Sequence, residues 1–219
     1  MRKKPTMPNW VMNELTCIFQ GSEELQSFKS KVKEDGFYNS FIPMPAILEG
    51  TQCPNINVDK LILDFNNEGN TATTLQEIID ANHPWLSRTA QQALKNQQAF
   101  VETGYFEWYK WCIDNWGVKW DACNIKTKEL TDFHTVIYSF NSPWDTPELF
   151  VRELSKLYPD ATFEMASGSI ENDTHYEFTC DNGKFEETCS YETFREAVED
   201  GKWGGLDDWS EYFEESEEV

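Results

Sequence analysis

The segment Trp116-Gly117-Val118-Lys119-Trp120-Asp121-Ala122 most constrains how this chain can fold. It follows a stretch with aromatic residues at helical spacing and precedes two strand-like runs, and its glycine permits a turn between them. We therefore interpret it as the joint at which a helical insertion, residues 46–116, returns the chain to a sheet. The residues that we assign to structural motifs are Trp10, Trp116, Gly117, Trp120, Asp121 and Trp144.

Alternating apolar residues predict the strands of that sheet. A first strand is expected at 13–20, where Leu15, Cys17 and Phe19 share a face, and a helix follows it from Ser22. After the joint, the same alternation predicts strands at 124–130, 133–140 and 162–166.

The helix between the last two of these strands has a clear start signal. We expect Thr146 at its N-cap, Pro147 at its first position and an acid after them. Its buried stripe is predicted to be Phe150, Leu154 and Leu157.

The order β-α-insertion-β-β-α-β predicts an α+β protein with the ferredoxin-like, split βαβ sheet. An extra C-terminal hairpin is expected from Asp181-Asn182-Gly183, which favours a type I′ turn, and an acidic helix should follow it. The predicted segments are therefore a first half of the core (1–45), the insertion (46–116), a second half (117–170) and an acidic region (171–219).

Charge is the strongest functional signal in the composition. The chain has 18 basic and 39 acidic residues, a net charge of −21, and residues 171–219 hold 17 acidic against 3 basic residues. Such a chain repels phosphate backbones and favours basic partners, including proteins that bind nucleic acid. Solubility alone is an equally good explanation of the charge.

The tail after Gly205 combines acids with an aromatic stripe, because Trp209, Tyr212 and Phe213 follow helical spacing. Buried aromatic anchors carry much of the energy of protein interfaces. The alternative is a disordered, solubilising tail, which we favour for its last few residues. The candidate partner-binding residues are Asp207, Asp208, Trp209, Glu211, Tyr212, Phe213, Glu214 and Glu215.

No sequence pattern indicates a metal site, a cofactor or a catalytic centre. His83, His134 and His175 lack ligand spacing, the six cysteines form no Cys-x-x-Cys pair, and no glycine-rich phosphate loop is present. Asp121 and Asp145 leave open a metal-dependent nuclease or hydrolase, although Asp145 can serve a helix start and Asp121 can pair with Lys119. We expect a protein that is not an enzyme.

A third possibility is an RNA- or single-stranded-DNA-binding module, with Tyr138 and Phe140 as stacking rings and Lys126 and Lys128 beside them. The net charge opposes it. No apolar run approaches the length of a membrane span, and none follows the basic first residues as a signal peptide requires, so we expect a cytoplasmic protein.

Four motifs resemble those of the YubB family, which occurs in bacteriophages and conjugative plasmids. They are Pro8-Asn9-Trp10 with Asn13, Ile42-Pro43-Met44-Pro45, Trp116-Gly117 with Lys119-Trp120-Asp121-Ala122, and Phe140 with Pro143-Trp144-Asp145-Thr146-Pro147. The resemblance covers residues 8–166 and implies a ferredoxin-like core and an accessory role inside a bacterial host. Where the family often has a cysteine after the first tryptophan, this chain has Val11-Met12.

Charge and resemblance together predict a non-catalytic phage or plasmid accessory protein. We expect it to bind and inhibit or redirect a host protein that is basic or binds nucleic acid. Its role would be anti-defence, of the anti-CRISPR or anti-restriction type, in the host cytoplasm. A folded polyanion can act as a DNA mimic, because its carboxylates take the places of phosphates.

Overall fold

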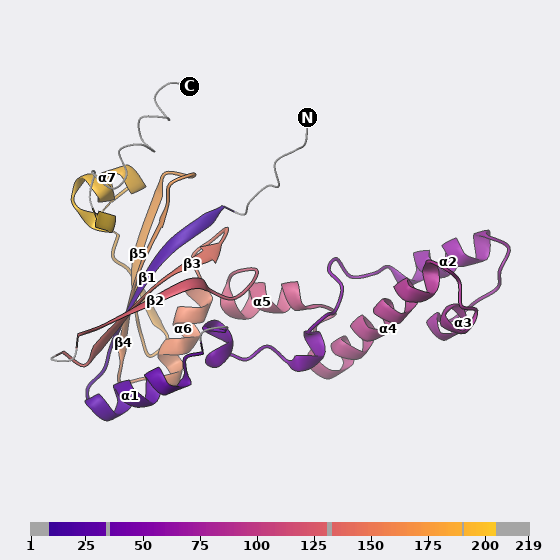
Figure 1. Cartoon of the computed structure of the whole chain (residues 1–219), viewed down its shortest axis with the longest axis horizontal. Coiled ribbons are helices and arrows are strands. Elements are labelled where there is room, and N and C mark those ends of the chain that lie inside the picture. The colour runs from indigo at the N-terminus through magenta and orange to yellow at the C-terminus, as the bar shows by residue number, and fades with distance from the viewer. Residues whose placement is uncertain (1–8, 34–35, 131–132, 190, 205–219) are drawn as a thin grey trace, which may run out of the picture. The chain divides into compact units, whose positions relative to one another are not determined.

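The computed structural model describes residues 9–33, 36–130, 133–189 and 191–204. The chain forms two compact units, one made of residues 1–42 with 115–219 and the other of residues 43–114 (Figure 1). No helix in the described ranges is long and apolar enough to cross a membrane.

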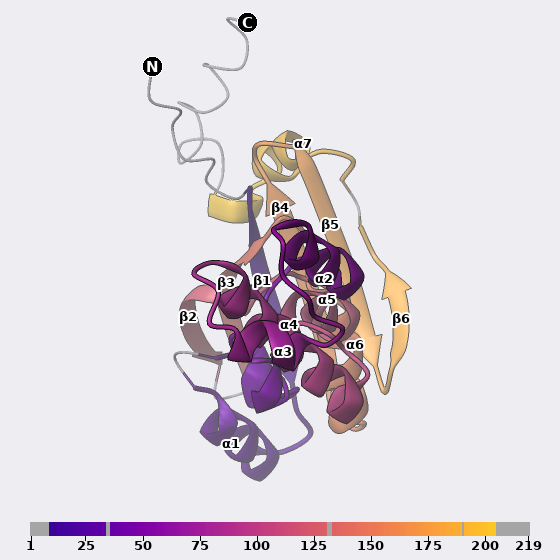
Figure 2. The same ribbon diagram turned by 90° about the vertical axis from the view of Figure 1, so that its right-hand side faces the viewer.

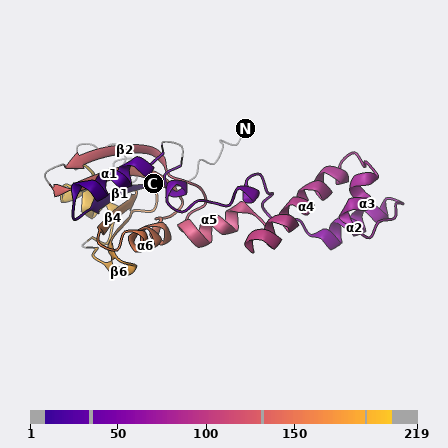
Figure 3. The same cartoon turned by 90° about the horizontal axis from the view of Figure 1, so that it is seen from below.

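The first unit is built on an antiparallel sheet in the order β2-β3-β1-β4-β5-β6, so the chain has the expected α+β architecture. Central β1 pairs with β3 on one side and with β4 on the other. Strands β2 and β6 form the two edges (Figure 3). The strands are β1 (Trp10–Ile18), β2 (Cys123–Leu130), β3 (Thr135–Pro143), β4 (Thr162–Ser169), β5 (Thr174–Asp181) and β6 (Lys184–Glu187).

Helices α1 (Ser22–Lys31) and α6 (Glu148–Leu157) pack against one face of this sheet through a cluster of aromatic rings. Phe28 of α1 stacks on Phe41 with centroids 4.6 Å apart and also contacts Tyr138 of β3. Phe150 of α6 contacts Tyr38 at 4.5 Å. The rings bury large apolar areas and make this the core of the unit.

Two details of α6 differ from the prediction. Leu157 is 56% exposed, whereas Val151 is buried with Phe150 and Leu154, because a 3.6-residue repeat brings position 151 onto the buried face. The cap is also shifted: Pro147 occupies the N-cap position, and the Thr146 backbone carbonyl accepts from Glu148 N.

Strand β1 begins at Trp10, three residues before the predicted start. The polar residue Asn13 interrupts the apolar alternation, yet it faces the core and is only 1% exposed. Its Nδ2 donates to Val11 O at 2.9 Å and to Ser142 Oγ at 2.8 Å, and its Oδ1 accepts from Ser167 Oγ at 2.8 Å. These bonds satisfy a buried amide that an apolar pattern does not reveal.

At the joint, Trp116 is buried and its Nε1 donates to Ile42 O at 3.0 Å. Gly117 has φ +83°, a conformation that favours glycine. The predicted pairing of Asp121 with Lys119 is wrong. Asp121 Oδ1 accepts from Tyr38 N at 2.7 Å and its Oδ2 accepts from Asn39 N at 2.9 Å, while Lys119 lies over the Trp120 ring.

The β5–β6 hairpin turns at Asn182 and Gly183, which have φ values of +46° and +76°. Positive φ at both residues is typical of the predicted type I′ turn. The turn sets the register Asp181–Lys184, and β6 continues the sheet at its edge (Figure 2). Helix α7 (Phe194–Glu199) and the 3₁₀ turn η4 (Lys202–Gly204) follow the hairpin.

The second unit is helical. It contains η2 (Ala46–Leu48), α2 (Val58–Asn67), α3 (Leu75–Asp80), α4 (Leu86–Thr103) and most of α5 (Trp108–Trp116). Leu61, Phe65 and Ile78 form its core with small residues of α4. Thr74 caps α3, and Glu77 completes a capping box.

Candidate functional site

The eight predicted partner-binding residues, Asp207 to Glu215, lie outside the described residues. The described part of the acidic region nevertheless exposes many carboxylates. Some of them already accept backbone hydrogen bonds: Asp173 from Arg195 N, and Glu196 from Glu192 N. The exposed acids of this region are Glu171, Asp173, Asp181, Glu186, Glu187, Glu192, Glu196, Glu199 and Asp200.

The register of the sheet assigns further charged residues to one face, since cross-strand partners share a face. Both rows below lie opposite α1 and α6, on what we call the open face. One row is Lys126, Ser139, Glu14, Ala166 and Glu177. The next row is Lys128, Ile137, Thr16, Glu164, Thr179 and Glu186.

The open face carries a glutamate on each of β1, β4, β5 and β6, namely Glu14, Glu164, Glu177 and Glu186. They alternate between the two rows, so neighbours are diagonal partners roughly 7–8 Å apart. All except Glu177 are exposed. The result is a line of carboxylates across four adjacent strands.

Helix α7 and η4 cover the part of the open face above β4 and β5. Gly168 of β4 makes this possible, because a Cβ there would lie 2.7 Å from the Phe194 ring and 3.2 Å from Trp203. Trp203 itself has φ +58°, a strained conformation for a bulky residue. The packing of its ring on the sheet compensates this strain.

Trp203 and Lys202 are also held by polar contacts to β5. The indole Nε1 donates to Nδ1 of the buried His175 at 3.3 Å, and Lys202 Nζ donates to Glu177 Oε1 at 2.8 Å. His175 Nε2 lies 3.2 Å from the same carboxylate oxygen, without the alignment of a hydrogen bond. We call these four residues the His175 cluster.

Burial lowers the pKa of His175 below its ordinary value, although Glu177 acts in the opposite direction. Burial alone would raise the pKa of Glu177, but Lys202 and His175 outweigh it and lower that pKa. At neutral pH these directions favour a neutral imidazole beside an ionised carboxylate and a lysine. In that state Nδ1 is free to accept from the indole.

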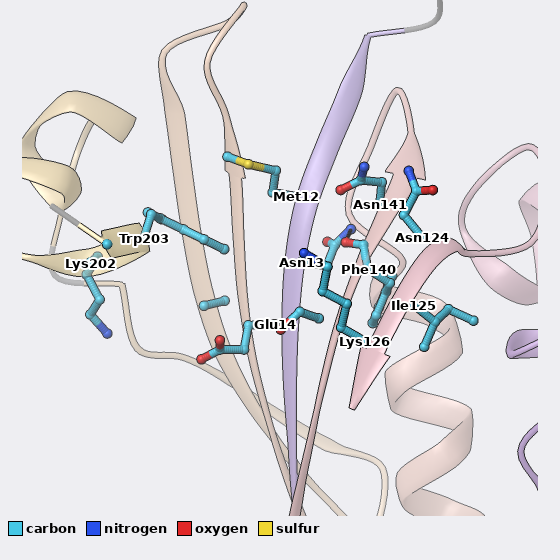
Figure 4. A pocket seen from close by; sticks show the side chains of 13 residues that line it. Met12, Asn13, Glu14, Asn124, Ile125, Lys126, Phe140, Asn141, Lys202 and Trp203 are labelled. Atoms are coloured by element: carbon cyan, nitrogen blue, oxygen red, sulfur yellow. Dashed lines mark hydrogen bonds between the residues drawn. The ribbon is translucent and has the colours of Figure 1, made fainter. Parts of the chain in front are cut away.

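Between η4 and β2, the open face forms a groove with a volume of about 810 Å³. Lys202 and Trp203 line it on the α7 side, and Asn124 and Lys126 line it on the β2 side (Figure 4). Met12, Glu14, Ser139, Asn141 and Ala166 lie between them. The lining of the groove is part polar and part apolar, and it holds one carboxylate between two lysines.

The carboxylates considered for metal-dependent hydrolysis have structural partners instead. Asp121 caps the turn at residues 38–40, and burial raises its pKa although backbone N–H groups act against that. Asp145 Oδ1 accepts from Thr146 N at 2.8 Å. In the described ranges, no three His, Cys, Asp or Glu residues are grouped so that they could hold a metal ion.

The arrangement expected for a nucleic-acid-binding module is wrong. Tyr138 and Phe140 are 2% and 3% exposed, because they face the aromatic core beneath the helices. Lys126 and Lys128 lie on the opposite, open face. The rings and the lysines therefore do not form one surface.

Sequence reasoning missed Glu14, Glu164, Lys202 and Trp203 as surface or groove residues. Glu14 had a usable signal, because it alternates with the core residues Leu15 and Cys17 and must face away from them. Trp203 had none: its place depends on a long-range contact with Gly168.

Comparison with known proteins gives little further information. No family model matches the chain, and no curated protein matches it. One solved structure is similar: the crystal structure of protein api92 from Yersinia pseudotuberculosis, assigned to DUF1281. It shares 12% identity with a TM-score of 0.44, over 84% of this chain and 99% of that protein.

Proposed function

We propose that this chain is a non-catalytic accessory protein of a phage or plasmid that binds a basic host protein and inhibits or redirects it. The line of glutamates on the open face is the observation that carries this proposal. A sheet holds carboxylates at fixed spacing, so they meet a cationic surface without first being ordered.

The acids of the β5–β6 hairpin and α7 extend the same negative surface. The hairpin includes the β6 edge and α7 covers the open face above β4 and β5, and both precede the seven further acids of residues 206–219. Such a surface suits an anti-defence role of the anti-CRISPR or anti-restriction type, in which carboxylates replace phosphates in a groove built for nucleic acid. The host cytoplasm is the corresponding location.

The strand order supports a ferredoxin-like core as part of this proposal. Strands β2-β3-β1-β4 are antiparallel, and helices follow β1 and β3 along the chain. This is the arrangement that a split βαβ unit requires. It agrees with the resemblance of residues 8–166 to the YubB family.

The test is capture of basic proteins from a host lysate by three forms of the chain. The intact chain should retain a basic protein that DNA displaces and that 500 mM salt releases. A chain ending at Gly205 separates the contribution of the tail. A triple variant, Glu14→Gln, Glu164→Gln and Glu186→Gln, separates that of the open face.

The matched control is Glu49→Gln, Asp59→Asn and Glu102→Gln, which removes three exposed acids from the other unit. Capture should be lost in the open-face variant and kept in the control. Equal capture by both would exclude the open face. Nucleotide or nucleic-acid turnover that EDTA stops would instead support the hydrolase alternative.

A further inference from the structure

Strand β2 is a free edge of the sheet. It pairs with β3 on one side, and no backbone hydrogen bond from described residues reaches its other side. A free edge presents N–H and C=O groups with which an extended chain can pair. β2 spans eight residues, of which 126–130 pair in continuous register with β3 after an irregularity at 123–126, and β6 has four residues, so β2 offers the longer edge.

A cavity lies beside β2 on each face of the sheet. On the open face, the groove described above reaches Asn124 and Lys126. On the helical face, a second cavity of about 500 Å³ lies between the end of α1 and β2, lined by Lys29, Val32, Lys33, Ile125, Thr127 and Tyr138. Side chains of a strand alternate between faces, so an added strand would direct successive side chains toward the two cavities.

Both sides of this edge are basic. Lys126 and Lys128 are exposed on the open face, and Lys33 is exposed at the second cavity. Lys29 already forms an ion pair with Glu129, so we do not count it among the lysines that a bound acidic chain would meet. Edge lysines often serve only to prevent sheets from joining, but that role does not explain a cavity on each face.

We propose that the β2 edge binds an extended acidic segment of a partner polypeptide by strand addition. Its alternate carboxylates meet Lys126 and Lys128 on the open face and Lys33 on the helical face. A polypeptide fits better than a nucleic acid, because only a polypeptide continues the backbone ladder. This surface is distinct from the acidic one in the proposed function, and its partner has the opposite charge.

The test uses the full chain and a synthetic octapeptide of alternating glutamate and valine. We expect binding by fluorescence anisotropy that weakens roughly tenfold between 50 and 300 mM salt. Amides within residues 124–130 should exchange more slowly with deuterium when the peptide is bound. The same peptide N-methylated at alternate residues keeps its charge but loses backbone N–H donors that strand pairing needs, and it should not bind.

The variant Lys126→Glu with Lys128→Glu should weaken peptide binding by about tenfold or more. The control Lys60→Glu with Lys110→Glu makes the same charge change at exposed lysines of the other unit and should leave binding unchanged. Thermal unfolding of each variant checks that both remain folded.

Equal binding of the N-methylated peptide, or protection outside β2, would overturn strand addition. A single-stranded oligonucleotide that protects the same amides would assign the edge to nucleic acid instead. Neutralising Glu164 and Glu186, which line neither cavity, should leave peptide binding intact, so this inference and the proposed function fail separately.

Discussion

Trp203 has a backbone conformation that is costly for its side chain, and two neighbours on the sheet make it possible. Gly168 leaves room for the indole ring, and neutral His175 accepts a hydrogen bond from the indole N–H. Protonation of His175 at Nδ1 replaces that acceptor with a donor. One of the two side-chain hydrogen bonds that attach η4 to β5 therefore depends on the charge state of one buried ring.

This dependence predicts a change of stability with pH. The folded state holds the pKa of His175 below its ordinary value of 6.5, so below that value the unfolded state binds more protons. The His175 contribution is fully present above pH 6.5 and is lost as the pH falls through 6.5 toward the lowered folded pKa. Urea unfolding between about pH 5 and 8 should show this decline.

The variant His175→Gln should flatten the dependence of the free energy of unfolding on pH. The parent protein and the variant both keep His83 and His134, so the difference between them reports on His175. The lowered pKa of Glu177 affects stability in a separate pH range. Its contribution to the free energy of unfolding is lost only below the ordinary glutamate pKa of 4.5. An unchanged slope above pH 5 in His175→Gln would exclude His175 as the source.

Gly168→Ala should lower the free energy of unfolding by about 1–3 kcal/mol, because the added methyl overlaps the Phe194 ring. The shift of α7 should also change the fluorescence of Trp203. Gly21→Ala is the control, since a Cβ there meets no atom within 4 Å and its φ is −153°. Denaturant unfolding monitored by fluorescence measures both.

At the scale of elements, α6 tests how well periodicity identifies a buried stripe. Leu154→Ala should cost about 2–5 kcal/mol of stability, because Leu154 is completely buried. Leu157→Ala should cost less than about 1 kcal/mol, because its side chain is mostly in solvent. Similar losses for both, measured by urea unfolding, would contradict the assigned stripe.

The order and type of the main strands and helices could be predicted because their signals are local. Leu15, Cys17 and Phe19 alternate, and Asn182-Gly183 suits a two-residue turn. Asn13 concealed the start of β1, since its burial depends on Ser142 and Ser167, which are far away in the sequence. Leu157 was assigned to the stripe because an i, i+4, i+7 pattern also fits a helix turned by one residue.

The site was less predictable than the fold. Total charge pointed to an acidic surface, but only the register brings Glu14, Glu164 and Glu186 onto one face. The rings of Tyr138 and Phe140 gave no sign of which face the helices would cover. Alternation with core residues could place Glu14 away from the core, but long-range pairing decides which strands are neighbours and which face the helices cover, and it leaves no local pattern.

At the scale of the whole molecule, the two units have separate cores. Ile78→Ala should remove about 2–5 kcal/mol from the core of residues 43–114, where Ile78 is fully buried. Hydrogen exchange should then accelerate in α2, α3 and α4, while the amides of β1 and β3 keep their protection. Equal acceleration in the sheet would mean that both units unfold together.

The sheet has lysines on its β2 edge and carboxylates on β4 to β6 toward its other edge, so its two sides carry opposite charge. A rigid body charged in this way experiences a torque in the field of a cationic partner and turns its acidic end forward before the two touch. Added electrolyte should then slow the arrival of that partner far more than it hastens its departure.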